Sequence, residues 1–304
     1  MKKQMSIKTL CKKWLTVKKK ELKETSFSTY YRIVNAHIMK DFKNYNIDLF
    51  IKKKSKLSAK TRYNIILVLI QILGYGKEKN CINIDYEIKL PKIRQKELRI
   101  LTSTERTRFI DYIIKSLNVE NLGFLITLYT GVRIGELCAL QWGDIDFNLE
   151  VLKINKTMQR IANTNENAKT KTRIIIDTPK SQKSIRSIPI PSFLIDILKR
   201  YKCKDTDYVL TGNSKYIEPR TYQAKFKRFL ISAKINHINF HALRHTFATM
   251  ALENGFDIKA LSEILGHSSI KITLDLYAHP SNEFKKKNMD NLISTYSWHE
   301  KIAK

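Results

Sequence analysis

The stretch HALRHTFATM, residues 241–250, places two histidines and an arginine within five positions. If the stretch is helical, His241, Arg244 and His245 fall at offsets of zero, three and four and share one face of the helix. Helices rarely bury three such groups without partners, because each group loses its hydration in an apolar core. The stretch therefore predicts that this cationic face holds a binding partner.

Four further side chains, between residues 133 and 277, offer related chemistry. They are Arg133 in TGVRIGEL, Lys180 in DTPKSQKSIRSIPI, His267 in ILGHSSIK and Tyr277 in ITLDLYAH. Taken singly, each has a plainer interpretation. Arg133 is spaced to form a salt bridge with Glu136, three residues further on, and Lys180 is expected in a solvated turn. By itself, His267 is a capping or surface histidine, and Tyr277 is a core residue.

Together, these residue types are what a single phosphodiester requires. Arginines present planar pairs of donors to non-bridging oxygens, and pre-aimed cations stabilise a transition state that gains charge. A lysine can protonate a leaving oxygen, a histidine can position or accept a proton, and a tyrosine can be a covalent nucleophile. The sequence shows neither a cluster of carboxylates for Mg²⁺ nor a G-x-x-x-x-G-K-[ST] loop. We therefore expect no metal site and no cofactor.

The charge of the chain favours a polyanionic partner. The formal net charge of the 304 residues is +28. Residues 1–100 carry 25 Lys and Arg against 8 Asp and Glu, a net of +17. Nucleic acid is the first partner that such an excess indicates, and an anionic membrane the second. The longest apolar run, IILVLIQILG, is too short to span a bilayer, and the N-terminus has no signal core, so we expect a cytoplasmic protein.

The periodicity of apolar residues predicts two domains. Residues 1–92 read mostly as helices, residues 93–102 as a charged linker, and residues 103–304 as helices interrupted by short strands. The strands are expected in EVLKINKT, TRIIIDT and SIRSIPI, with a polar loop, RIANTNENAKTKT, between the first two and a hairpin tip at Lys180. A helix break is expected near Gly131. The predicted fold is mainly α with a small antiparallel β-sheet.

The order of the segments TGVRIGEL, TPKSQKSIRSIPI, HALRHTFAT and LGHSSIKITLDLYAH resembles the tyrosine recombinase family, the phage and mobile-element integrases. The resemblance covers about residues 100–300. It implies a pocket for phosphate binding and proton transfer, with a tyrosine nucleophile. The implied catalytic residues are Arg133, Lys180, His241, Arg244, His267 and Tyr277. Lys183 is a rival for the role of the lysine, and His245 is expected to be structural.

The same resemblance implies a reaction and its partners. Residues 1–92 would be a helical core-site DNA-binding domain, and residues 103–304 a mixed α+β catalytic domain ending in a segment that docks on a neighbouring protomer. The enzyme would recombine double-stranded DNA at a specific core site through a 3′-phosphotyrosyl link, as a homotetramer on synapsed DNA. Accessory directionality or DNA-bending proteins are candidate partners.

Two alternatives to a recombinase remain at this point. One is a type IB topoisomerase-like enzyme, which uses a similar pocket as a monomer. The other is a catalytically silent DNA-binding regulator that keeps the fold. Since the chain begins almost directly with the predicted DNA-binding helices, we expect no additional arm-site-binding domain.

Overall fold

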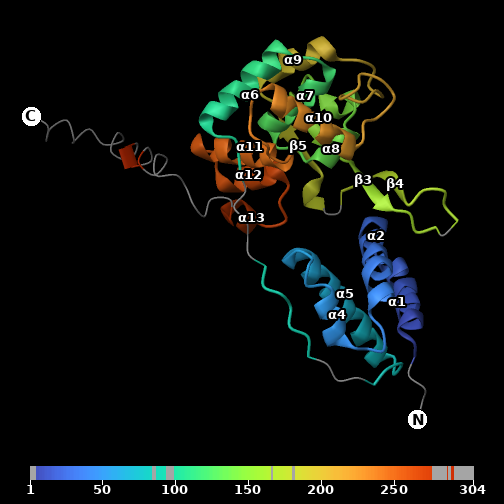
Figure 1. The fold of residues 1–304 in the computed structure, drawn as a ribbon. Helices are drawn as coiled ribbons and strands as arrows, with labels where there is room; N and C mark the ends of the chain where they lie inside the picture. The colour runs from blue at the N-terminus through green and yellow to red at the C-terminus, as the bar shows by residue number, and fades with distance from the viewer. Residues whose placement is uncertain are drawn as a thin grey trace, which may run out of the picture. The chain divides into compact units, whose positions relative to one another are not determined.

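The structure, a computed structural model, describes residues 5–83, 87–93, 99–165, 167–179, 182–275, 286 and 289–290. It is mostly helical with small antiparallel sheets, as the sequence predicted (Figure 1). No helix within these ranges is long and apolar enough to cross a membrane. The chain divides into two compact units. The first contains Met1–Glu97 and Arg160–Ile175, and the second contains Leu98–Gln159 and Ile176–Lys304.

The first unit is built mainly from helices whose starts are set by short polar side chains. Its helices are α1 (Ile7–Glu21), α2 (Glu24–Ile33), α3 (Met39–Asp41), α4 (Ile47–Lys53) and α5 (Ala59–Glu78). One stretch of π-helix, Val34–Ile38, joins α2 to α3. The side chains of Ser6, Asn46 and Ser58 accept backbone N–H groups at the starts of α1, α4 and α5. Such caps satisfy donors that the first turn of a helix leaves free.

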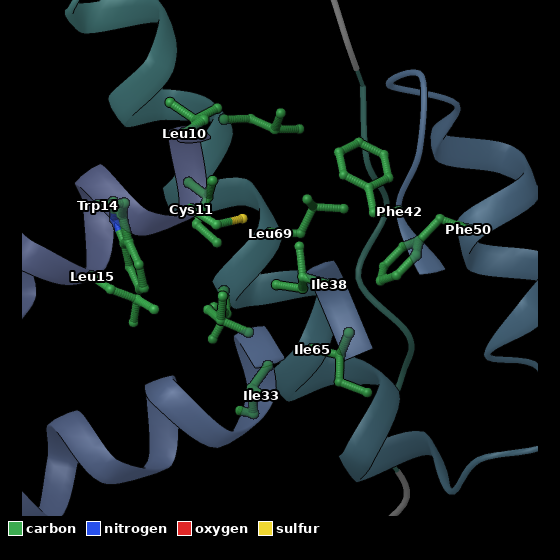
Figure 2. Packing of buried hydrophobic residues seen from close by; sticks show 14 of the residues in the cluster. Leu10, Cys11, Trp14, Leu15, Ile33, Ile38, Phe42, Phe50, Ile65 and Leu69 are labelled. Atoms are coloured by element: carbon green, nitrogen blue, oxygen red, sulfur yellow. The ribbon is translucent and has the colours of Figure 1, made fainter. Parts of the chain in front are cut away.

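Helix α5 supplies the centre of the core of the first unit. It contains the longest apolar run of the sequence, and its residues Ile65, Leu69 and Ile72 recur at helical spacing and are buried. Figure 2 shows Ile65 and Leu69 among buried side chains from other helices, including Trp14 of α1 and Phe50 of α4. Each such side chain stabilises the folded unit by roughly 1.5–3 kcal/mol through its removal from water.

A two-stranded hairpin, β3 (Thr157–Ala162) and β4 (Thr172–Asp177), contributes its outer part to the first unit. The N–H of Ala162 donates to Ser28 Oγ in α2 at 2.7 Å. Arg173 of β4 forms an ion pair with Glu24, the first residue of α2. The sequence predicted a loop from residue 160 onward, but the strand continues to Ala162 because its partner strand and α2 both bind its backbone.

The stretch EVLKINKT was predicted as one strand and is instead two. Strand β2 (Val151–Ile154) ends before Asn155, and β3 begins after Lys156. The side chains of both intervening residues contact the carboxylate of Asp144, at 3.2 Å from Asn155 Nδ2 and 3.0 Å from Lys156 Nζ. These contacts interrupt the strand, so that β2 and β3 enter different sheets.

The second unit has an aromatic core that sets the start of α11. Its helices are α6 (Ser103–Lys115), α7 (Val119–Thr130), α8 (Ile134–Ala139), α9 (Ser192–Tyr201), α10 (Pro219–Ser232), α11 (His241–Glu253), α12 (Ile258–Leu265) and α13 (Ile270–Asp275). The ring of Phe124 in α7 lies 5.0 Å from that of Phe229 in α10 and 6.3 Å from that of Phe240. Phe240 directly precedes α11, so this packing positions the first turn of the helix that begins at His241.

The residues before α6 are tied to α11. Arg99 Nη1 donates to two backbone carbonyls of the segment that precedes α11. Leu101 is buried, and its N–H donates to Thr246 Oγ1 in α11. Thr102 and Glu105 form a capping box at the start of α6. The end of the predicted linker therefore packs as part of the second unit.

The main sheet of the second unit has the strand order β1 (Ile145–Asp146), β2 and β5 (Arg186–Pro189), all antiparallel. Leu152 pairs with Ile188, and Ile154 pairs with Arg186. Since β4 and β5 belong to different sheets, the connection between them does not close a hairpin, and that prediction for the Lys180 segment was wrong. The reason is that β5 pairs with β2, which lies earlier in the chain.

Helix α7 ends at the break that the sequence predicted. Gly131 follows it with φ of +66°, in the left-handed region that favours glycine. A Cβ added to Gly131 would lie 2.5 Å from Cδ1 of Phe247 and 2.8 Å from Cδ2 of Leu265. Both neighbours belong to a buried cluster between α11 and α12. This turn therefore requires glycine for two reasons: its backbone conformation, and the lack of space for a Cβ beside Phe247 and Leu265.

We expect Gly131→Ala to lower the free energy of unfolding by about 2 kcal/mol or more, because it adds backbone strain and overpacks this cluster. Thermal or urea unfolding followed by circular dichroism measures the change. Gly74→Ala is the matched control. Gly74 lies inside α5 with no heavy atom within 4 Å of an added Cβ, so this change should raise stability by roughly 0.5–1 kcal/mol. Equal effects at the two glycines would contradict the prediction.

Candidate active site

The predicted cationic helix over residues 241–250 is confirmed as part of α11. His241, Arg244 and His245 fall within its first two turns. The rings of the two histidines meet edge to face, with centroids 4.5 Å apart. His245 Nδ1 is buried and has no hydrogen-bond partner. In this arrangement His245 packs against His241.

Arg244 is the most deeply buried arginine of the site, at 2% exposed. Its Nη1 donates to the carbonyl of Gly131 at 2.7 Å, and its Nη2 to the carbonyl of Leu265 at 2.6 Å. Burial, followed by the charge of Arg133, lowers the pKa of Arg244 to about 9, which leaves it cationic at neutral pH. Its hydrogen-bond acceptors in the described part of the chain are both neutral carbonyls. A buried cation without a carboxylate partner favours the binding of an anion.

The carboxyl end of α12 gathers three arginines. The carbonyl oxygens of residues 264–266 each accept a hydrogen bond from a different arginine. The donors are Arg186 Nε at 2.6 Å, Arg244 Nη2 at 2.6 Å and Arg133 Nη2 at 2.9 Å. The last carbonyls of a helix have no partners within it, and they form the negative end of its dipole. The helix end therefore attracts and orients the cations around it.

Glu136 links two of these arginines. The ion pair with Arg133 that the spacing allowed is present, with Nη1 at 2.8 Å from Oε1. Arg186 adds two hydrogen bonds, from Nη1 to Oε1 at 3.1 Å and from Nη2 to Oε2 at 2.9 Å. Burial by itself would raise the pKa of Glu136, but the hydrogen bonds and charge of Arg186 and the charge of Arg133 lower it below its ordinary value. Glu136 is therefore a buried carboxylate that stays ionised.

Sequence reasoning missed Arg186, although a signal for it was present. In SIRSIPI, Arg186 stands two and four residues before Ile188 and Ile190. Alternation along a strand places all three on the same face. Ile188 and Ile190 are buried, so the pattern already indicated an arginine that points inward. Glu136 is the carboxylate that pairs with this arginine.

His267 lies immediately after Gly266, the residue that caps the end of α12. Its Nδ1 is 2.9 Å from Oγ1 of the buried Thr273, which orients the ring. Burial, followed by the charges of Arg244 and Arg133, lowers the pKa of His267 to about 4. Burial, followed by the neighbouring His245 and Arg244, also lowers the pKa of His241 to about 4. Both imidazoles are therefore neutral at pH 7.

Two of the predicted site residues, Lys180 and Tyr277, lie outside the described residues. Lys183, the rival of Lys180, is described, and its Nζ donates to the carbonyl of Ser268 at 3.2 Å. Lys183 thus contacts the segment that follows His267. The predicted C-terminal docking segment, residues 288–304, is described only at residues 289–290.

The structure brings four of the six predicted residues into one site. Arg133, His241, Arg244 and His267 come from the turn after α7, from α11 and from the segment after α12. The Arg133 side chain is 34% exposed, so it is accessible to a ligand. Cationic guanidinium groups beside neutral imidazoles can bind an oxyanion and exchange protons with it. No group of three or more His, Cys, Asp or Glu among the described residues is arranged to hold a metal ion.

Comparison with known families agrees with this site. A sequence model of the phage integrase family matches residues 93–283. A second model, for the N-terminal SAM-like domain of phage integrases, matches residues 6–55. The two matches fall on the segment around the arginine site and on the helices of the first unit. Both models describe phage integrases. The two alternatives, a type IB topoisomerase-like enzyme and a catalytically silent regulator, receive no support from these matches.

Individual relatives point to the same family. The chain is 32% identical over 207 residues to a tyrosine recombinase XerC-like protein of Caldanaerobacter subterraneus subsp. tengcongensis, covering 62% of this chain and 53% of that protein. The match therefore spans about half the length of that relative. The chain is 25% identical over 318 aligned positions to the ICEBs1 integrase of Bacillus subtilis, covering 95% of this chain and 83% of that protein.

Solved structures show the same fold. The chain superimposes on the Tn1549 transposon integrase in complex with a circular intermediate DNA with a TM-score of 0.73. The sequence identity is 23%, and the match covers 95% of this chain and 100% of that one. At this identity the likeness is one of fold, and it extends over both units.

Burial and the neighbouring cations determine how the histidines of the site titrate. In the DNA-free protein, we expect His241 and His267 to protonate with midpoints near pH 4, well below the ordinary value of about 6.5. Between these two pH values the unfolded chain binds more protons than the folded one, so stability should fall as the pH drops through this range. Side-chain NMR of labelled histidines measures the midpoints, and His241→Asn and His267→Asn assign the signals. Midpoints near 6.5 would contradict the prediction.

Proposed function

Since this chain belongs to the phage integrase family of tyrosine recombinases, we propose that it is a site-specific DNA recombinase that cleaves and rejoins DNA through a 3′-phosphotyrosyl intermediate. One observation carries the proposal. Among the described residues, the hydrogen-bond acceptors of the buried cation Arg244 are neutral carbonyls, and Arg133 lies beside it with an accessible side chain. This pair suits a phosphodiester, whose non-bridging oxygens share one negative charge.

The two arginines would bind and polarise the scissile phosphate. Arg133 donates to Glu136 and Gly266 from two of its nitrogens, so other N–H groups of its guanidinium stay available for a phosphate oxygen. Because Arg244 is 2% exposed, we expect DNA binding to uncover one edge of its guanidinium. Fixed cations of this kind stabilise the charge that develops at phosphorus in the transition state.

The protons would move between side chains. The Tyr277 hydroxyl oxygen attacks phosphorus, the bond from phosphorus to the 5′-oxygen breaks, and the 5′-strand leaves as a hydroxyl. Neutral His241 accepts the tyrosine proton, and Lys180 supplies a proton to the leaving oxygen. Thr273 holds Nδ1 of His267, so Nε2 of that ring can contact the phosphate. The phosphotyrosyl link conserves the bond energy, and a 5′-hydroxyl from another strand reverses the step.

The first unit would supply much of the affinity for DNA. Residues 1–100 carry a net charge of +17, and cations that contact phosphates release counterions when they bind. The match to a SAM-like domain of integrases also falls there. We therefore assign core-site binding to the first unit and the chemistry to the second.

A tetramer on synapsed DNA is the proposed working assembly, because strand exchange needs a nucleophile for each of four strands. The C-terminal segment supports it by sequence, with an apolar side at Met289, Leu292, Ile293 and Trp298 that a neighbouring protomer would cover. One relative is named ICEBs1 integrase, and one similar solved structure is that of the Tn1549 transposon integrase, which favours a mobile element as the source. Because it would act on cellular DNA, we propose a cytoplasmic location, with directionality or DNA-bending proteins as candidate partners.

The covalent step gives the decisive test. A nicked suicide substrate, whose short cleaved end diffuses away, should trap a protein–DNA adduct in EDTA that survives denaturant and maps to Tyr277. Tyr277→Phe should bind the site with similar affinity, since only one hydroxyl is lost, yet form no adduct. An adduct at another residue, or cleavage that requires Mg²⁺, would overturn the proposed mechanism.

Lys180 should act as the general acid. We expect Lys180→Ala to slow cleavage by about 10²–10⁴-fold, the span of lost acid–base catalysis. A substrate with sulfur in place of the leaving 5′-oxygen should hide the defect, because a thiolate leaves without protonation. Lys183→Ala is the matched control. Lys183 is bound to the carbonyl of Ser268, so any defect in it should persist with the sulfur substrate. Rescue of Lys183→Ala and not of Lys180→Ala would reverse the assignment.

A further inference from the structure

We propose that Arg186 is a positioning residue for Arg133. It fixes the direction of the Arg133 side chain, and it offsets the charge of Glu136 so that Arg133 can bind the scissile phosphate. The inference rests on the function proposed above, and it concerns a residue that the chemistry of cleavage does not itself use. It is carried by the contacts of Arg186, by the place of Glu136 between two arginines, and by the burial of both.

The hydrogen bonds of Arg186 are directed into the protein, which argues against a direct role with DNA. Its side chain is 6% exposed. Nε donates to the carbonyl of Ile264, Nη1 donates to Glu136 and to the carbonyl of Ser184, and Nη2 donates to Glu136. Four of the five N–H groups of a guanidinium are thus used within the protein. Arg133, in contrast, has a side chain that is 34% exposed.

Without Arg186, the negative charge of Glu136 would offset the positive charge of Arg133. Glu136 is 3% exposed and forms an ion pair with Arg133. An arginine paired one-to-one with a buried carboxylate presents little net charge to a phosphate, and the carboxylate repels the phosphate across a medium that screens poorly. Arg186 adds a second positive charge to the same carboxylate. Arg133, Glu136 and Arg186 together then carry a net charge of +1, and Arg133 is the member of the group that is accessible to DNA.

The same contacts fix the direction of Arg133. Each carboxylate oxygen of Glu136 accepts one hydrogen bond from each arginine. Oε1 accepts from the Nη1 atoms of Arg133 and Arg186, and Oε2 accepts from the backbone N–H of Arg133 and from Nη2 of Arg186. The bidentate fork of Arg186 therefore fixes the plane of the carboxylate. That plane in turn sets the direction of the hydrogen bond to Arg133 Nη1.

Arg186 also joins three parts of the site. It lies in β5, it binds α8 through Glu136, and it binds the carboxyl end of α12 through Ile264. Its bond to the carbonyl of Ser184 reaches the segment before β5 that carries Lys183. A displacement of Arg186 would therefore also shift Arg133 and the backbone carbonyls of residues 264–266, one of which binds Arg244.

The test compares two substrates for each protein. One suicide duplex has an ordinary scissile phosphate, and the other has a methylphosphonate there, which lacks the negative charge. Single-turnover adduct formation is measured for the wild type, Arg186→Gln and Arg186→Lys. The ratio of the two rates is independent of the fraction of protein that is folded. Arg106→Gln is the matched control, because Arg106 forms an ion pair with Glu253 away from the site.

We expect Arg186→Gln to slow cleavage of the ordinary phosphate by about 10²-fold, comparable to the loss of one stabilising donor. The ratio of phosphate to methylphosphonate rates should fall by about tenfold or more, since a neutral substrate is not repelled by Glu136. Arg186→Lys should lie between Arg186→Gln and the wild type, because it keeps the charge and loses the fork. Arg106→Gln should leave the ratio unchanged.

The other outcomes decide against the proposal. A wild-type rate in Arg186→Gln, an unchanged ratio in both Arg186 variants, or loss of cleavage on both substrates would each show that Arg186 does not act through the charge of the phosphate. If neither Arg186 variant folds, as judged by thermal unfolding, its role is structural and the proposal is wrong. Absence of any adduct with the wild type would refute the proposed function instead, so the two failures are distinguishable.

Discussion

The site depends on the carboxyl end of one short helix. The last carbonyls of α12 have no acceptor role within the helix, and three arginines from separate parts of the chain donate to three of them in succession. Like charges repel, so three guanidinium groups would not gather without negative partial charge to hold them. Gly266, in the left-handed conformation with φ of +62°, ends the helix there and leads directly into His267. The same turn thus places the cations and one of the histidines.

A single buried carboxylate completes this balance. Glu136 lies between Arg133 and Arg186 and stays ionised despite its burial. The positive field that remains lowers the pKa of His241 and His267, after the larger effect of burial. A site that is strongly cationic thereby keeps its imidazoles neutral. Neutral imidazoles can accept protons at pH 7, whereas imidazolium ions cannot. Anion binding and proton transfer therefore have a common electrostatic origin.

Much of the architecture was predictable because it rests on local pattern. The apolar repeat of α5, the capping box of Thr102 and Glu105 and the break at Gly131 all follow from interactions between residues close in the chain. The contacts of the β-segments were harder to predict. Asn155 and Lys156 end a strand because Asp144 binds them, and Ala162 remains in a strand next to Ser28 of α2. These partners lie 11 to 134 residues away, and strand propensity does not record them.

The sequence by itself determined the chemical identity of the site, because residue type and spacing specify what a side chain can do: arginines for an oxyanion, histidines for proton transfer, and one face of a helix for His241, Arg244 and His245. Tertiary structure decided which of these groups are charged, buried or free. The i,i+3 spacing already indicated an ion pair between Arg133 and Glu136, but only the fold brings Arg186 to the same carboxylate, from 50 residues away. Charge and hydration depend on every neighbour in space, and those neighbours are set by packing between elements that are distant in the chain.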